Sequence, residues 1–594
     1  MPTEILASAE KKLLNSKLHL SLIFLLAMAG CAQQPEKPAV APAAPTADVA
    51  AKAAETKPAE SQALPKIDLS SQTLYQFLLA EIAGQRGQSG LAVESMLDLA
   101  KSTRDYRLAR RSTELALHSR QEARALDAAR LWLILAPNEV RARQMVSALL
   151  VNSGRLDEAK IHLERLLADE DGHVGSSFLS LHQMLSRQSD KAGVLNLVQD
   201  LAAPYPQVPE AHFAVAQAAW AAEKDEIALR EILEASRLRP GWEAAALFQG
   251  QILLRDSPSQ ALDFFKEYLD SAPKALEARL TYARLLVAEK HYAEARNQFE
   301  KLTVEFPQNA EVSVALGLLS MQLHDYDKAE LHLKRALTEK YHDANSVKMY
   351  LGQLYEDRKQ YSEALVWYGN VTPSEHALAA QLKYAAMLAK LNRTPEALQH
   401  LHQINVQNNQ QRVQVAIAEA QLLRSAKSHQ DAYELLGKML EKLPNYPDLL
   451  YEHAMAAEKI GRSDVLEQDL RKLIQIKPDY AHAYNALGYT LAEHGERLEE
   501  AAQLIEKALK LSPGDPFIID SMGWVQYRLG ALDKALGYLK RAYAEQADPE
   551  IAAHLGEVLW AQGNREEASK IWQAAQKENP DNETLLDVIK KFKP

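Results

Sequence analysis

A small residue returns about every 34 residues along most of this 594-residue chain. Fifteen such positions run from Ala92 to Ala568, and all of them are alanine except Val194 and Leu466. A second small residue precedes most of these markers by about one helix length. The apolar residues in between keep the three-to-four spacing of a helix, so each repeat is predicted to be a pair of helices that cross at the small residues. One pair cannot bury its apolar face alone, so the pairs must stack.

The 34-residue period with its paired small residues resembles the tetratricopeptide repeat (TPR). A proline follows the second helix of most repeats, as Pro240, Pro273 and Pro307 do, because proline cannot donate the next helical hydrogen bond. The pattern predicts an all-α fold, a TPR superhelix (α-solenoid) of about fifteen helical hairpins over residues 70–580. A C-terminal capping helix is expected in residues 581–594, where it would close the last hairpin.

Three repeats depart from the pattern. His182 and Gln249 stand where the first helix of a repeat is expected to carry a small residue. The repeats at about 173–206 and about 445–478 are the weakest matches overall, because the second helix of each lacks its alanine marker.

Residues 1–30 have the layout of a lipoprotein signal peptide. Lys11, Lys12 and Lys17 precede a short apolar run that ends at Gly30. A helix that spans a bilayer needs about 20 apolar residues, and this run has about half of that number. The segment is therefore expected to direct export and to be cleaved.

Cys31 is the only cysteine of the chain, which excludes disulfide frameworks and thiolate metal clusters. The sequence Met-Ala-Gly-Cys at 28–31 resembles the lipobox of bacterial lipoproteins, with methionine where that family prefers leucine. The resemblance implies an acylated Cys31 held in the lipid bilayer. Ala32 in place of aspartate implies sorting to the outer membrane, with the protein on its periplasmic face. The alternative is an ordinary signal peptide that ends in a free cysteine.

Residues 31–69 are predicted to form a lipid-anchored, disordered tether. This segment is rich in alanine and proline and has almost no large apolar side chains. It cannot bury enough apolar surface to offset the entropy of an ordered chain. The folded part of the protein can therefore stand clear of the membrane.

The charge balance and the motif search narrow the possible functions. The chain has 68 basic and 79 acidic residues, a net charge of −11, which argues against a dedicated nucleic-acid binder. Phosphate loops, zinc-binding helices and nucleophile elbows do not occur in the sequence. We therefore expect no catalytic residues, no metal and no cofactor, and a scaffold that binds other proteins. An enzyme or a polysaccharide-binding protein remains an alternative.

Aromatic and polar residues gather on the first helices near the C-terminal end. Taking the small residue as position 8 of each repeat, positions 2, 5, 9, 12 and 13 are expected to face the concave groove of the superhelix. Amphipathic rings beside polar anchors suit the binding of an extended peptide or a partner helix. The alternative is that these rings pack between repeats as core. The candidate groove residues are Asn485, Tyr489, Phe517, Asp520, Trp524, Tyr527, Arg528 and Trp560.

A second candidate surface lies on the opening hairpin. Its first helix carries apolar side chains that no preceding repeat covers, and a basic stretch at 104–130 follows it. An end repeat normally presents a polar outer face, so an apolar one suggests docking of a partner. The basic stretch could attract an acidic partner, or it could be a solvated helix face. The candidate residues are Leu74, Tyr75, Phe77, Leu78, Arg110 and Arg111.

The two ends of the array carry a more specific resemblance. The opening residues 74–117, the segment AYNALGYTLAE at 483–493 and residues 515–530 resemble the outer-membrane lipoproteins that act as adaptors for a periplasmic carboxyl-terminal processing protease. Membership implies that the chain binds and activates the protease and delivers cell-wall hydrolases to it for degradation. The apolar opening hairpin is assigned to the protease, with support from this resemblance. The aromatic groove around Trp524, Tyr527 and Trp560 is assigned to the clients as a second, separate surface.

The alternative function is a lipoprotein scaffold for another machine of the cell envelope. Pilus assembly, outer-membrane protein insertion and peptidoglycan synthesis all fit an anchored helical scaffold equally well. Neither function requires peptide-bond chemistry from this chain.

Overall fold

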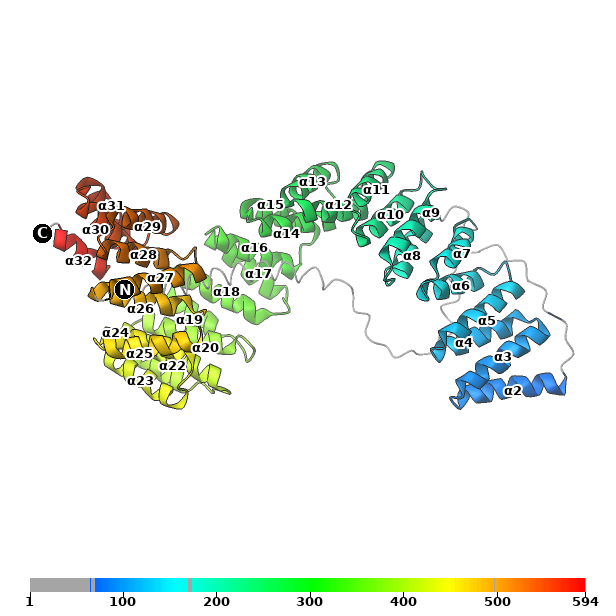
Figure 1. Ribbon diagram of the computed structural model, residues 1–594, viewed down its shortest axis with the longest axis horizontal. Helices are drawn as coiled ribbons and strands as arrows, with labels where there is room; N and C mark the ends of the chain where they lie inside the picture. Colours follow the sequence, from blue (N-terminus) through cyan, green and yellow to red (C-terminus); the bar gives the residue numbers. More distant parts are fainter. Residues whose placement is uncertain (1–64, 66–69, 169–173, 496, 593–594) are drawn as a thin grey trace. The chain divides into compact units, whose positions relative to one another are not determined.

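The computed structural model describes residue 65 and residues 70–168, 174–495 and 497–592 (Figure 1). Every regular element in these ranges is an α-helix. The helices belong to two compact units that divide between Glu305 and Phe306. Helices α2 to α15 form the N-terminal unit, and α16 to α32 form the C-terminal unit. The described helices pair into fifteen hairpins and one closing helix, which confirms the predicted all-α TPR array.

The N-terminal unit contains seven hairpins. They are α2 (Ser71–Gln85) with α3 (Ser89–Thr103), α4 (Tyr106–His118) with α5 (Glu122–Leu135), α6 (Val140–Asn152) with α7 (Leu156–Ala168), α8 (Val174–Leu185) with α9 (Lys191–Ala202), α10 (Pro209–Ala221) with α11 (Asp225–Leu238), α12 (Glu243–Asp256) with α13 (Pro258–Ser271), and α14 (Leu276–Ala288) with α15 (Tyr292–Glu305).

The C-terminal unit contains eight hairpins and the closing helix. They are α16 (Ala310–Gln322) with α17 (Tyr326–Thr338), α18 (Ala344–Asp357) with α19 (Tyr361–Gly369), α20 (Ala377–Lys390) with α21 (Thr394–His402), α22 (Asn409–Ser425) with α23 (His429–Lys442), α24 (Pro447–Lys459) with α25 (Ser463–Ile476), α26 (Ala481–His494) with α27 (Leu498–Leu511), α28 (Pro516–Arg528) with α29 (Leu532–Glu545), α30 (Pro549–Ala561) with α31 (Arg565–Glu578), and α32 (Glu583–Phe592).

In most hairpins the small residues that define the repeat lie where the two helices cross. Fourteen of the fifteen markers are fully buried, and Val194 is 5% exposed. Where the first helix carries glycine, the second helix places a large side chain against it. A Cβ atom on Gly317 would collide with Leu333, for example, and one on Gly523 would collide with Leu539. The spacing of small residues therefore reports close helix contact, as expected from the sequence.

The two breaks in the pattern have different outcomes. Gln249 is buried, and the neighbouring Gly250 makes the close approach to Phe265 instead. His182 is exposed, and α8 packs mainly on α10 rather than on its own partner α9. The weak match of this repeat therefore reflects a hairpin whose two helices do not cross closely.

Local sequence signals set the ends of the helices that carry the C-terminal groove. Asp515 caps α28 by accepting a hydrogen bond from the backbone N–H of Phe517, and a proline occupies the first turn. Asp548 caps α30 in the same way. The turn after each of these helices contains a glycine with positive φ, Gly530 at 80° and Gly563 at 89°, a conformation that favours glycine.

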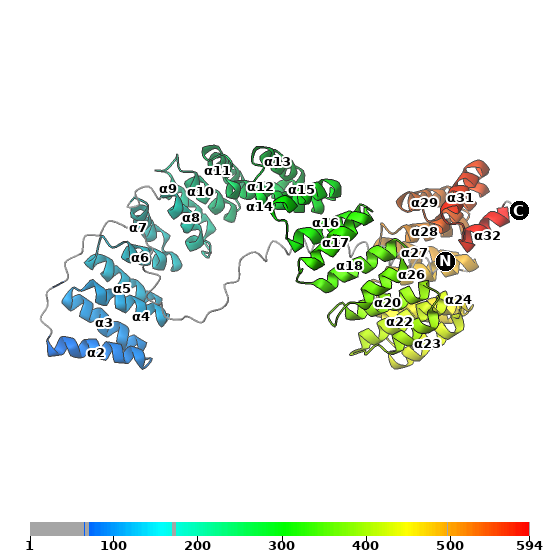
Figure 2. The same ribbon diagram turned by 180° about the vertical axis from the view of Figure 1, so that it is seen from behind.

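The hairpins of the C-terminal unit follow one another in chain order from α16 to the closing helix α32 (Figures 1 and 2). Neighbouring first helices contact each other directly, as α26 does α28 and α28 does α30. The side chains of these first helices that face away from the second helices therefore share one surface. This is the surface on which the sequence predicts a groove.

Candidate functional site

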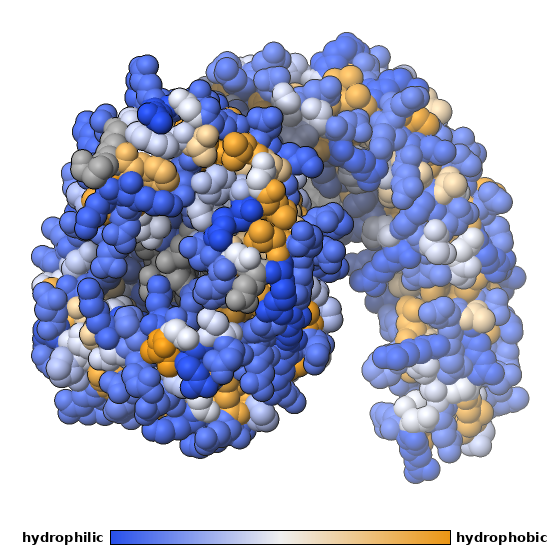
Figure 3. Space-filling view, turned by 60° about the vertical axis from the view of Figure 1, so that its left-hand side comes forward, coloured by the Kyte–Doolittle hydropathy of each residue, from blue (hydrophilic) through white to orange (hydrophobic). Residues whose placement is uncertain are grey.

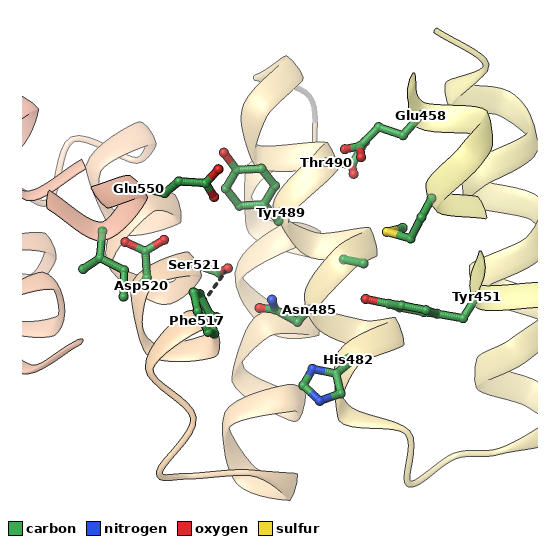
Figure 4. Close-up of a pocket in the computed structure, with 13 residues that line it drawn as sticks. Tyr451, Glu458, His482, Asn485, Tyr489, Thr490, Phe517, Asp520, Ser521 and Glu550 are labelled. Carbon is green, nitrogen blue, oxygen red and sulfur yellow. Dashed lines mark hydrogen bonds between the residues drawn. The ribbon is translucent and has the colours of Figure 1, made fainter. Parts of the chain in front are cut away.

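A groove lies on the first helices of the last four hairpins (Figure 4). The space that it encloses is about 40 Å³, room for only about three ordered water molecules. The principal side chains that line it are Tyr451, Met455 and Glu458 of α24, His482, Asn485, Tyr489 and Thr490 of α26, Phe517, Asp520 and Ser521 of α28, and Glu550 and Ile551 of α30.

Half of the groove residues expected from the sequence line this site. Asn485 and Tyr489 come from α26, and Phe517 and Asp520 come from α28. They occupy positions 2, 5 and 9 of their repeats, three of the five positions that were expected to face the groove. Figure 3 shows the hollow of the C-terminal unit among mostly hydrophilic residues. The binding role of these four residues stays a prediction.

Trp524 has a different position from the one expected. Its side chain is 6% exposed, and its ring stacks on the His554 imidazole with a centroid distance of 4.3 Å. Its indole N–H donates a hydrogen bond of 2.9 Å to Glu493. The ring thus packs between repeats, which was the alternative reading of the aromatic pattern. Tyr527 lies beside Trp524, and Arg528 donates to the backbone carbonyl of Glu493.

Trp560 belongs to the C-terminal cap and not to the groove. Its ring stacks on Trp572 and lies against Phe592 of α32, each at a centroid distance of 5.8 Å. The sequence predicted the closing helix but not which aromatic residue it would cover. The expected placement of Trp524 and Trp560 on the groove wall is therefore corrected, because the neighbouring repeat covers one ring and the cap covers the other.

Helix α24 contributes groove residues that were not among those expected from the sequence. Tyr451, Met455 and Glu458 line the groove, and they come from one of the two weakest repeats. A usable signal was present: with Ala454 as position 8, these residues occupy positions 5, 9 and 12. Applying the same position rule to this repeat would have identified them.

Carboxylates dominate the electrostatics around the groove. Asp520 pairs with the His554 imidazole at 2.9 Å, and both are buried. Burial opposes protonation of His554, but Asp520, Glu550 and Glu493 outweigh it and raise its pKa. Burial, aided by Glu493 and Asp520, also raises the pKa of the Tyr489 phenol, which therefore stays neutral. The site is acidic and favours cationic groups.

Two acceptor atoms in the groove have no hydrogen-bond partner. They are Oδ1 of Asn485 and Oε2 of Glu458, and both atoms are buried. The Asn485 side chain is 7% exposed. Buried polar atoms are almost always paired, so these two mark the part of the groove where a donor is missing.

The opening hairpin presents an apolar face, as expected. Leu74, Tyr75, Phe77 and Leu78 of α2 are between 38% and 65% exposed. Ile82 extends the same face and is 45% exposed, although it was not among the residues expected from the sequence. The signal for it was its place on the helix, four residues after Leu78. The docking role of this face stays a prediction.

Two arginines of the basic stretch are paired with carboxylates of the hairpins. Arg111 donates two hydrogen bonds to Glu81, at 2.9 and 3.0 Å, and so ties α4 to α2. Arg110 pairs with Glu114 one turn further along α4. These contacts give Arg110 and Arg111 a structural role, and the attraction of an acidic partner stays a prediction.

The predicted lipid anchor lies outside the described residues, and the described residues offer neither a membrane-spanning helix nor a metal site. Cys31, the signal segment and most of the tether fall in residues 1–64, so the anchor stays a prediction. Within the described ranges no helix is long and apolar enough to cross a bilayer. The same ranges contain no group of three or more His, Cys, Asp or Glu side chains placed to hold a metal ion.

Known proteins with tetratricopeptide repeats are similar to this chain. Tetratricopeptide repeat family models match residues 253–319, 286–354, 451–516 and 526–590. Among solved structures, the TPR protein TTC0263 of Thermus thermophilus is 25% identical over 30% of this chain and 96% of its own, with a TM-score of 0.28. The Cut9–Hcn1 structure is 15% identical over 83% of this chain and 97% of the other, with a TM-score of 0.30.

Two curated proteins are similar in sequence. TPR repeat-containing protein MJ1428 of Methanocaldococcus jannaschii is 29% identical over 138 residues, 23% of this chain and 24% of its own. TPR repeat-containing protein PA4667 of Pseudomonas aeruginosa is 32% identical over 490 residues, 82% of each chain. A match of that length covers most of the array, and the chain therefore belongs to the TPR repeat-containing protein family that includes PA4667.

Proposed function

We propose that this chain is a membrane-anchored adaptor that binds and activates a periplasmic carboxyl-terminal processing protease and delivers cell-wall hydrolases to it. One observation carries the proposal: two chemically different surfaces lie on the two separate units of one TPR chain. The apolar face of α2 belongs to the N-terminal unit, and the acidic groove belongs to the C-terminal unit. An adaptor that holds two partners at once needs two such surfaces.

The α2 face is assigned to the protease. Tyr75 is 65% exposed and Leu78 is 48% exposed, and burying such side chains against a partner is favourable by about 1.5–3 kcal/mol each at full burial. The resemblance of the opening residues to protease adaptors supports the same assignment. The groove is assigned to clients, because its polar and aromatic lining suits segments of varied sequence.

The anchor completes the proposal. The lipobox-like sequence that ends at Cys31 would hold the chain at the periplasmic face of the outer membrane, and the tether would allow the folded units to reach partners near the cell wall. The chain itself supplies no catalytic group in this scheme; the protease performs the hydrolysis.

An affinity pull-down from envelope extract tests the function. The tagged full chain is expected to retain a carboxyl-terminal processing protease, identified by mass spectrometry. The triple variant Leu74→Ser, Tyr75→Ser, Leu78→Ser should retain at least about tenfold less, because a few apolar anchors carry most of an interface energy.

The control is the double variant Ile134→Ser, Ile161→Ser. These isoleucines are 69% and 68% exposed on second helices of the same unit, so the control removes similar apolar area away from α2. It should retain as much protease as the wild type. Absence of the protease from the wild-type eluate would refute the adaptor function, whereas equal retention by the triple variant would refute only the assignment of α2.

A further inference from the structure

The strongest unexplained feature of the molecule is a pair of unsatisfied acceptors in the groove. Oδ1 of Asn485 and Oε2 of Glu458 are buried and accept no hydrogen bond. They line one groove from neighbouring first helices, α26 and α24 (Figure 4). Because buried acceptors without donors are unfavourable, a group that supplies N–H donors at this place would bind favourably.

Three other carboxylates near this place already have donors. Asp520 is paired with His554, and Glu493 accepts from the indole N–H of Trp524. Glu557 of α30 is paired with Lys591 at 2.8 Å. Among these four carboxylates, Glu458 is thus the one with a buried oxygen that accepts no hydrogen bond. A hydrogen-bond donor from a ligand is therefore needed at the α24 side of the groove.

The charge state of Glu458 supports the same conclusion. Burial raises the pKa of its carboxyl group, and the nearby Lys459 and His494 offset this effect only in part. The negative charge of the ionised carboxylate is therefore only partly offset by positive groups of the protein. A cation placed against it would favour ionisation and would gain a charge-assisted hydrogen bond, which is stronger than a neutral one.

Aromatic rings flank the acceptors. The Tyr451 side chain extends from α24 toward Asn485, and Tyr489 projects from the next turn of α26 (Figure 4). Phe517 lies on the far side of Asn485 (Figure 4). Such rings pack well against the aliphatic stem of a long side chain, and their faces attract its cationic end.

We propose that this groove binds an extended peptide segment through a lysine or arginine side chain, whose cationic end pairs with Glu458 while a peptide N–H donates to Asn485. The inference rests on the proposed function, since it names the chemistry by which the groove would recognise its clients. An acidic segment is disfavoured, because it would meet Glu458, Asp520 and Glu550 in the same groove.

Fluorescence anisotropy with three peptide pools tests the inference on the purified full chain. Each pool consists of labelled peptides with acetylated and amidated ends and mixed Ala, Gly, Ser and Tyr positions around one fixed central residue. The fixed residue is lysine in the first pool, norleucine in the second and glutamate in the third. The lysine pool is expected to bind about tenfold more tightly than the norleucine pool, and its affinity should fall as salt is raised.

Two matched variants locate the effect. Glu458→Gln keeps the shape of the side chain and removes its charge, so it should reduce the affinity of the lysine pool to about that of the norleucine pool. Glu506→Gln is the control, because Glu506 lies on the second helix α27, where it pairs with Lys510; it should leave binding unchanged. Circular dichroism melts of both variants show whether they remain folded.

Several outcomes overturn the inference. Equal binding of the three pools, preference for the glutamate pool, or an unchanged affinity in Glu458→Gln would each do so. If Glu458→Gln failed to fold, the pool comparison and the salt dependence of the wild type would still decide the matter. Failure here leaves the protease pull-down unaffected, so the inference and the proposed function fail separately.

Discussion

Replacing Gly556 with alanine is expected to destabilise the C-terminal unit by about 3 kcal/mol. A Cβ atom at this position would overlap the indole of Trp572, a fully buried ring that donates a hydrogen bond of 3.3 Å to the carbonyl of Ala553. The ring cannot move away freely, because Trp560 and Phe592 stack on it. Urea unfolding followed by tryptophan fluorescence should show the loss as an earlier transition.

The matched control is Gly537→Ala. Gly537 lies within α29 of the same unit, and an added Cβ would meet no atom within 4 Å. Alanine is better than glycine in a helix by about 0.8–1.0 kcal/mol, so this change should stabilise the unit slightly. Equal effects of the two substitutions would mean that the glycines of first helices do not mark the close crossings of the array.

Replacing Glu452 with leucine is expected to cost about 3–5 kcal/mol. Glu452 of α24 pairs with Arg424 of α22 at 2.7 Å, and the two side chains are 7% and 5% exposed. Removing the carboxylate leaves a guanidinium charge between two hairpins with little access to water. Urea or thermal unfolding of the full chain measures the cost.

The double variant Glu452→Leu, Arg424→Met separates loss of a partner from loss of packing. Replacing a buried ion pair by apolar residues of similar size is often neutral or stabilising, so the double variant should recover most of the stability that Glu452→Leu loses. A double variant as unstable as the single one would show that shape, and not the unpaired charge, dominates at this contact.

The fold could be predicted from the sequence because its main determinant is periodic. A close helix crossing favours small residues, and most repeats carry them at two fixed places, as Gly317 in the first helix of one repeat and Ala329 in its second helix. The repeat of α8 and α9 is an exception, because the exposed His182 and the packing of α8 on α10 depend on neighbours that its own sequence does not specify.

The candidate site was predictable only in part, because an aromatic residue at helical spacing fits either a groove or a core. Asn485 and Tyr489 lie in the groove. Trp524 occupies the same position in the next repeat as Tyr489 does in its own, but its ring stacks on His554. That difference comes from a residue 30 positions away in the chain, so the helix carrying Trp524 does not encode it. The unsatisfied oxygen of Glu458 likewise emerges only from the packed structure.

The proposed adaptor must hold a protease and a client at the same time. Mass photometry of the purified full chain, mixed with the carboxyl-terminal processing protease and a peptidoglycan endopeptidase, can detect this state. A complex that contains all three proteins is expected. The triple variant Leu74→Ser, Tyr75→Ser, Leu78→Ser is expected to lose only the protease, and Glu458→Gln is expected to lose only the endopeptidase. Binary complexes that exclude each other would contradict the adaptor function.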